Sequence, residues 1–225
     1  MEEKKFVGIR KEEFSVKQFI KKEFGMGKVS TVTIDYTPVG ERITVSTHKP
    51  GLIIGKRGET IEKLTNILKR KFKMENPHID IAEIMKPELD AQLVADEIAL
   101  ALERFGSMRF KAVSYRMLGR IKNAGALGAE LVVAGKLPAD RAKTWRFTFG
   151  YLKKTGDSAN LVDRAKSTAN TQKGLVGIKV SILKPENKTH DSIVVDEELM
   201  NKIKQNVAFV EEPVQKKKAK KRVKK

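Results

Sequence analysis

Hydrophobic and polar positions in the first third of the chain repeat first with a helical period, then with a strand period. Residues 11–24 predict an amphipathic helix whose apolar face consists of Phe14, Val16, Phe19, Ile20 and Phe24. Residues 30–37 and 42–48 alternate at every second position, which predicts two strands. A helical turn at 52–54, a helix over 59–73 and a strand over 78–85 follow. The predicted order is therefore helix–strand–strand–turn–helix–strand.

The pattern then becomes helical before it returns to long strands. Pro87 suits a helix start, and apolar residues at helical spacing reach Phe105. A second helix is expected over 108–123. Strands are expected over 129–135, 145–151 and 176–182. The segment 161–172 fits a strand or a helix, and its polar residues at every second position favour a strand.

These elements predict an α+β chain with three parts. Residues 1–86 would form one domain, and residues 87–185 a second, with helices packed on a mainly antiparallel four-stranded sheet. Residues 186–212 mix acidic residues with few apolar ones, and 213–225 form a lysine-rich tail. We expect that tail to be disordered in the free protein, because like charges repel and core residues are lacking.

The charge points to a polyanionic partner. Lys and Arg exceed Asp and Glu by 18 in 225 residues, and the pI is about 9.9. Such a field favours nucleic acid over an anionic membrane surface, and no apolar run is long enough to span a bilayer. We therefore expect no membrane partner. The absence of cysteine excludes disulfides and thiolate chemistry, and it fits a cytoplasmic location.

One short segment carries candidate chemistry. Gly55 and Gly58 flank Lys56 and Arg57 directly before the helix over 59–73. Glycine lets the backbone approach a phosphodiester closely, and a helix start offers N–H groups without intrahelical partners. A GxxG loop between two helices is how a KH module holds single-stranded nucleic acid. The surrounding elements occur in the order of a type II KH domain, so we expect all four residues, and Lys49 nearby, to contact RNA.

Catalytic and metal-binding patterns are lacking in the sequence. There is no Ser/His/Asp arrangement, no Walker loop and no dinucleotide fingerprint. His48, His78 and His190 lie far apart without a second ligand at metal spacing. We expect no enzyme activity, no cofactor and no metal.

A resemblance goes beyond the GxxG loop. The module is joined to a helical pair, then to a glycine-bounded strand at 125–137 and another at 174–182. Over about residues 5–185, this combination resembles the universal KH-domain ribosomal proteins of the small subunit, small-subunit protein three, in their archaeal or eukaryotic form.

The resemblance implies a structural protein of the ribosomal head that binds small-subunit rRNA and neighbouring proteins and helps line the channel through which mRNA enters. In that family, a basic face on the helix before the second domain's first strand touches mRNA. Here that helix carries Lys111, Arg116, Arg120 and Lys122. The bacterial pattern is denser near the helix start, where this chain has uncharged residues at 112–115.

Other interpretations remain open at this stage. Arg146, Lys166 and Lys179 alternate with inward residues of strands, and each could contact rRNA or serve solubility. Trp145 could stack on a base, although its run of alternating aromatics favours the core. The chain could also be a free-standing KH regulator or a nucleic-acid-processing enzyme such as a DNA lyase. A regulator would more usually repeat the KH unit, and no second GxxG module with its helix pattern appears in the sequence.

Overall fold

The computed structural model describes residues 2–38, 40–72, 74, 76–138, 141–187, 200 and 203. These residues build two hydrophobic cores, one from residues 16–81 and one from residues 89–182. The chain is α+β, as predicted. The predicted tail at 213–225 lies outside the described residues, as do His190 and most of 186–212.

The N-terminal module has the predicted KH order of elements. They are α1 (Glu2–Phe24), β1 (Val29–Thr37), β2 (Gly40–Thr47), α2 (Pro50–Ile54), α3 (Glu59–Phe72) and β3 (His78–Glu83). The sheet order is β1-β2-β3, with β1 and β2 antiparallel and β2 and β3 parallel. A parallel pair needs a crossover connection. Here that connection consists of α2, the GxxG loop and α3, so the sheet fixes both ends of the segment that carries the loop.

Helix α1 differs from its prediction in two respects. It begins at Glu2 instead of residue 11, and Phe14 is 61% exposed instead of buried. The first turns are rich in Lys, Glu and Arg, which have good helix propensity, so this stretch is helical although its apolar side chains are exposed. Phe14 lies about 200° around the helix from the buried Val16, because successive residues are about 100° apart. The core face consists of Val16, Ile20 and Phe24, with Phe19 packed at its edge.

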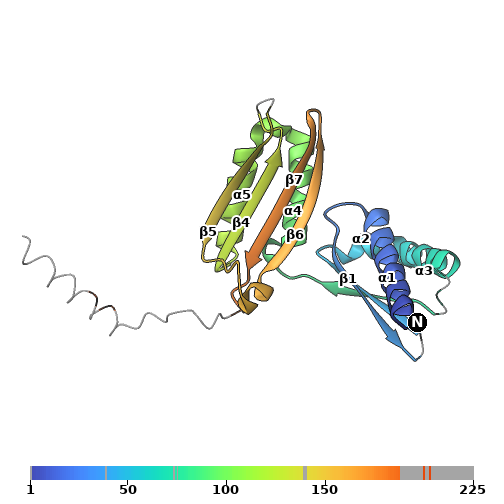
Figure 1. Ribbon diagram of the computed structural model, residues 1–225. Coiled ribbons are helices and arrows are strands. Elements are labelled where there is room, and N and C mark those ends of the chain that lie inside the picture. Colours follow the sequence, from blue (N-terminus) through green and yellow to red (C-terminus); the bar gives the residue numbers. More distant parts are fainter. Residues whose placement is uncertain are drawn as a thin grey trace, which may run out of the picture. The chain divides into compact units, whose positions relative to one another are not determined.

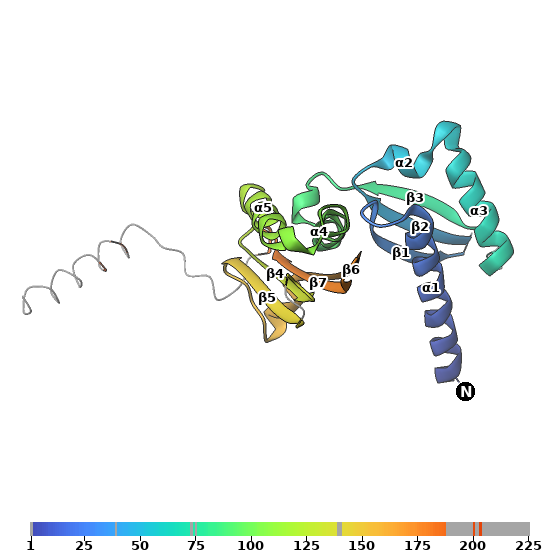
Figure 2. The same ribbon diagram turned by 90° about the horizontal axis from the view of Figure 1, so that it is seen from above.

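The C-terminal module packs two helices on one face of a four-stranded sheet. Its elements are α4 (Ala91–Phe105), α5 (Phe110–Asn123), β4 (Gly128–Gly135), β5 (Lys143–Gly150), β6 (Asp163–Thr171) and β7 (Gly174–Leu183). The order is β5-β4-β7-β6, and every neighbouring pair is antiparallel. Helix α4 contacts β6 and β7, whereas α5 contacts β4 and β5. Figures 1 and 2 both show the two helices on the same side of this sheet.

The uncertain segment 161–172 is a strand, as favoured, but the start of α4 was placed too early. Pro87 opens a separate 3-10 turn (Pro87–Leu89), and the α-helix begins at Ala91. Asp90 is the N-cap, and its carboxylate accepts hydrogen bonds from the N–H groups of Gln92 (3.0 Å) and Leu93 (3.1 Å). Its other oxygen accepts a 2.6 Å hydrogen bond from the Ser30 hydroxyl.

Phe105, the last of the apolar residues at helical spacing, is 47% exposed. It is the last residue of α4, and Gly106 follows with a φ of 79°. The chain thus leaves the helix at Gly106, and the Phe105 ring remains largely outside the core.

Candidate nucleic-acid interface

The GxxG loop joins α2 to α3, as the sequence predicted. Gly55 ends α2, and its N–H donates a 3.0 Å hydrogen bond to the Gly51 carbonyl. Residues Lys56–Gly58 form one 3-10 turn, after which α3 begins at Glu59. The loop therefore has a defined backbone that is closed by hydrogen bonds on its α2 side.

The two glycines are needed for different reasons. Gly55 has φ 73° and ψ −172°, a region that only glycine occupies readily. A Cβ on Gly55 would also lie 2.0 Å from Thr60 Oγ1. Gly58 has φ 83°, but a Cβ there would meet nothing within 4 Å. Gly55 thus permits close packing of the loop on α3, whereas Gly58 supplies only the turn and leaves open space beside the backbone.

Both loop cations are available to a ligand. Lys56 and Arg57 are exposed, and neither has an ion-pair or hydrogen-bond partner among the residues the structure describes. Arg57 has φ 55° and ψ 24°, and it is the one non-glycine residue with positive φ in the described ranges. Left-handed backbone at such a residue costs about 1–2 kcal/mol, and strained residues cluster at functional sites.

Glu59, the first residue after the loop, carries a negative charge that would repel an anion, but this charge is paired with Lys63. Lys63 donates a hydrogen bond to the Glu59 carboxylate one helical turn away and forms an ion pair with it. That hydrogen bond, followed by the charge of Lys63, lowers the pKa of Glu59 below its usual value. The loop therefore keeps its net positive charge at neutral pH.

Lys49 lies in the same module, at the N-terminal end of α2, whereas the GxxG loop follows the C-terminal end of this helix. It directly precedes α2, its side chain is exposed, and its N–H donates a 3.1 Å hydrogen bond to Thr47 Oγ1. Its predicted RNA contact is compatible with this exposure and stays a prediction.

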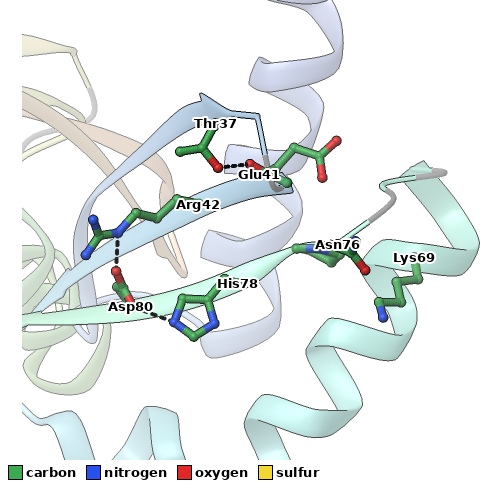
Figure 3. Close-up of a pocket in the computed structure, with 9 residues that line it drawn as sticks. Thr37, Glu41, Arg42, Lys69, Asn76, His78 and Asp80 are labelled. Carbon is green, nitrogen blue, oxygen red and sulfur yellow. Dashed lines mark hydrogen bonds and ion pairs between the residues drawn. The ribbon is translucent and has the colours of Figure 1, made fainter.

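A cleft of about 580 Å³ lies elsewhere in the KH module, away from the loop residues. It is lined by the ends of β1, β2 and β3 and by Lys69 of α3. Figure 3 shows Arg42 and His78 both directed at Asp80, which pairs with each of them. The positive charge of Arg42 is thus already matched within the cleft, in contrast to Lys56 and Arg57.

The four predicted cations of α5 lie on two different sides of the helix. The Lys111 ammonium lies 4.6 Å from the ring centroid of Trp145, and Lys122 lies 5.8 Å from that of Phe149. Arg116 and Arg120 instead line a cleft of about 260 Å³ against α4, together with Arg104. Arg104 was not among the predicted RNA contacts, because it lies on a different helix.

Of the two arginines in this cleft that belong to α5, Arg120 has its positive charge partly balanced by a carboxylate. Arg120 Nη1 lies 2.6 Å from Glu97 Oε1, and both side chains are about half exposed. Trp145 packs beside the core against Phe110, at 5.4 Å between ring centroids, as the favoured interpretation held.

Arg146 lies on the sheet face that the helices do not cover. Its Nε is 2.8 Å from Glu130 Oε1, and Lys154 Nζ is 3.0 Å from the other oxygen of Glu130. The Glu130 side chain is only 11% exposed. Lys154 was missed because it follows β5 in a loop without a periodic signal.

Metal and membrane sites find no support in the described part of the chain. No group of three or more His, Asp or Glu side chains there could hold a metal ion. None of the helices described in the structure is both long and apolar enough to cross a bilayer.

These features define a KH-type nucleic-acid-binding protein with a second α+β domain. The KH domain family model matches residues 15–89, and the model described as ribosomal protein S3, C-terminal domain, matches residues 98–182. The chain belongs to the ribosomal protein S3 family, which confirms the resemblance found in the sequence.

The relatives are archaeal proteins, and their sequences align with most of this chain. Small ribosomal subunit protein uS3 of Methanocaldococcus jannaschii is 37% identical over 199 residues, 88% of this chain and 95% of the relative. The protein of that name from Methanococcus maripaludis is 34% identical, covering 87% and 92%. The Halobacterium salinarum protein is 35% identical, covering 81% and 60%. These relatives are named as a ribosomal protein, a structural component rather than an enzyme, in agreement with the expectation from the sequence.

Proposed function

We propose that this protein is a structural component of the small ribosomal subunit that binds rRNA. The observation that carries the proposal is the GxxG loop, in which two exposed, unpaired cations follow a glycine that tolerates no side chain. The loop lies within a chain that belongs to the ribosomal protein S3 family from its KH domain to its C-terminal domain.

The loop suits a nucleic-acid backbone better than a small ligand. Lys56 and Arg57 are exposed and offer positive charge to a phosphodiester, while the open space beside Gly58 permits close approach. Phosphate contacts of this kind supply affinity and position without reading bases. The bound RNA is therefore held in place by the module, as a structural role requires.

A finer proposal concerns mRNA. We place incoming mRNA against α5, because Lys111, Arg116 and Lys122 are exposed there. Lys111 and Lys122 lie over aromatic rings, which restrains their side chains on the β5 side of the helix. In this proposal α5 helps line the channel through which mRNA enters the subunit.

The remaining expectations form part of the same proposal. Residues 1–86 act as the KH domain, 87–185 as the ribosomal domain, and 186–225 as an extension. The partners are small-subunit rRNA, mRNA and neighbouring small-subunit proteins. The place of action is then the small subunit in the cytoplasm.

Sedimentation of a cell extract through a sucrose gradient tests the ribosomal role. The protein should sediment with small subunits and remain there after a high-salt wash. A protein found only at the top of the gradient would overturn the proposal and would favour a free-standing KH regulator.

A further inference from the structure

The C-terminal sheet leaves one face uncovered. Helices α4 and α5 pack on the side formed by Leu131, Phe147, Ala165, Ile178 and Val180. Side chains alternate across a strand, so the residues between these point away from the helices. Figures 1 and 2 show no helix over that side of the sheet among the coloured elements.

Strand register places cations side by side on this open face. Val132 of β4 is paired with Arg146 of β5 on one side and with Lys179 of β7 on the other. Lys179 is in turn paired with Lys166 of β6. One row across all four strands therefore carries Arg146, Lys179 and Lys166, and all three side chains are exposed.

Two of these cations are placed unfavourably for the isolated fold. Directly opposed residues on antiparallel strands have Cβ atoms about 4.5–5.5 Å apart, and like charges there are destabilising. Within the described ranges, neither Lys166 nor Lys179 has an ion-pair or hydrogen-bond partner. An anion lying over this pair would remove the repulsion.

The acidic residue on the face does not cancel the charge. Glu130 is the one carboxylate at an outward position of β4–β7, and it is shared by Arg146 and Lys154. Arg164 adds another exposed cation beside the row. Five cations thus face one largely buried carboxylate.

The uncharged residues of the face identify the kind of anion. Thr148, Thr168 and Ser181 occupy the next outward positions after Arg146, Lys166 and Lys179 on β5, β6 and β7, and their hydroxyl groups can donate hydrogen bonds to phosphate oxygens. No aromatic side chain occupies an outward position of these four strands. Base stacking is the usual means of holding unpaired bases, so the face suits a phosphodiester backbone.

We propose that this open face, with Arg146, Lys166 and Lys179 as its central row, binds the phosphodiester backbone of folded small-subunit rRNA without reading its sequence. The inference rests on the proposed ribosomal function. It gives the protein a second rRNA-binding surface in addition to the GxxG loop. Phosphate contacts position a protein on nucleic acid, so the face would fix the C-terminal domain on the rRNA.

The test compares three forms of the full chain: the wild type, Lys166→Gln/Lys179→Gln, and Lys11→Gln/Lys22→Gln. The last pair removes the same charge from exposed positions of α1. The probe is an in vitro transcript of small-subunit rRNA, titrated at several salt concentrations. The open-face variant should bind about tenfold more weakly, and its log–log salt slope should fall by about 1.4–1.8, since each phosphate contact contributes about 0.7–0.9. The α1 control should keep the wild-type slope.

The other outcomes are equally informative. Wild-type affinity and slope in the open-face variant would overturn this inference, and the ribosomal function would stand if the wild type still bound the transcript. A variant with unchanged rRNA binding that no longer sediments with small subunits would assign the face to an acidic protein, and would also overturn it. Failure of the wild type to bind or to sediment would contradict the proposed function itself. Circular dichroism checks that the variant is folded.

Discussion

The GxxG loop and the open face of the C-terminal sheet both present unpaired cations, but the backbone brings these cations together in different ways in the two regions. In the loop, Lys56 and Arg57 are neighbours in sequence, and a glycine on each side sets the backbone. On the open face, Lys166 and Lys179 become neighbours only through the pairing of β6 with β7. The loop is therefore sensitive to local backbone changes, whereas the face depends on strand register.

The largest expected effect is a loss of stability in the loop. Gly55→Ala places a Cβ 2.0 Å from Thr60 Oγ1 at a backbone conformation that alanine avoids. We expect the KH module to lose about 3 kcal/mol, since strain and overpacking each cost about 1–3 kcal/mol. Gly58→Ala should lose only about 1–2 kcal/mol, because the space around it is open.

Urea unfolding followed by two signals measures this difference. Trp145 is the single tryptophan and lies beside the C-terminal core, so its fluorescence reports on that module, while circular dichroism reports on both. Gly55→Ala should shift the circular dichroism transition and leave the fluorescence transition in place. Equal effects of the two glycine substitutions would contradict the packing argument.

Next in size is the loss of RNA binding on charge reversal. Lys56→Asp/Arg57→Asp should weaken binding of the rRNA transcript at low salt at least tenfold, because two phosphate-facing cations become anions. Stability should change by less than about 0.5 kcal/mol, as is usual for exposed positions. Lys11→Asp/Lys22→Asp, with the same change of charge, is the control. Unchanged affinity together with an unchanged circular dichroism spectrum would show that the loop does not clamp RNA.

A smaller effect of opposite sign is expected on the open face. Lys179→Gln removes the repulsion from Lys166 and should raise the unfolding free energy by about 0.2–1 kcal/mol in the absence of RNA. The fluorescence of Trp145 during urea unfolding measures this gain. Lys56→Gln, which has no like charge paired across a strand, should leave the stability unchanged. A loss of stability in Lys179→Gln would mean that Lys179 already has a favourable environment.

The smallest effect concerns Glu59. The hydrogen bond from Lys63 and the charge of Lys63 lower the pKa of Glu59. The interaction therefore stabilises the folded protein fully at pH values above the unfolded-state pKa of Glu59. This stabilisation disappears as the pH falls through the folded-state pKa. In Lys63→Gln the pKa of Glu59 should move up towards its ordinary value, which NMR titration of the carboxyl can follow. RNA binding at neutral pH should weaken slightly, because an unpaired carboxylate would then lie beside the loop. An unchanged pKa would show that the ion pair does not form in solution.

The two regions also differ in how far the sequence alone could identify them. The GxxG loop is a contiguous signal, so its place between two helices was predicted correctly. The outward positions of Arg146, Lys166 and Lys179 also follow from alternation. Their arrangement in one row does not, because it depends on the strand order β5-β4-β7-β6, which sequence periodicity does not contain.

The differences between the predicted and the observed fold have a related cause. Hydrophobic periodicity detects a helix only where it packs on a core, so the projecting turns of α1 before residue 11 were missed. The same method assigned Phe14 to the apolar face of its helix and included Phe105 in a helical pattern because both are apolar, although both side chains are exposed. The α5 cations were identified as a set, and a rotation of about 100° per residue already places them on two sides of the helix. Which side faces α4 and which faces β5 depends on the tertiary packing, which the sequence pattern does not contain.

The salt dependence of rRNA binding by three variants tests the central claim most directly. They are the loop variant Lys56→Gln/Arg57→Gln, the open-face variant Lys166→Gln/Lys179→Gln, and their combination in the full chain. Two independent phosphate-binding surfaces predict that each pair lowers the log–log slope by about 1.4–1.8 and that the combination lowers it by the sum of both. A loop variant with the wild-type slope would contradict the assignment of the GxxG loop as a phosphate-binding site.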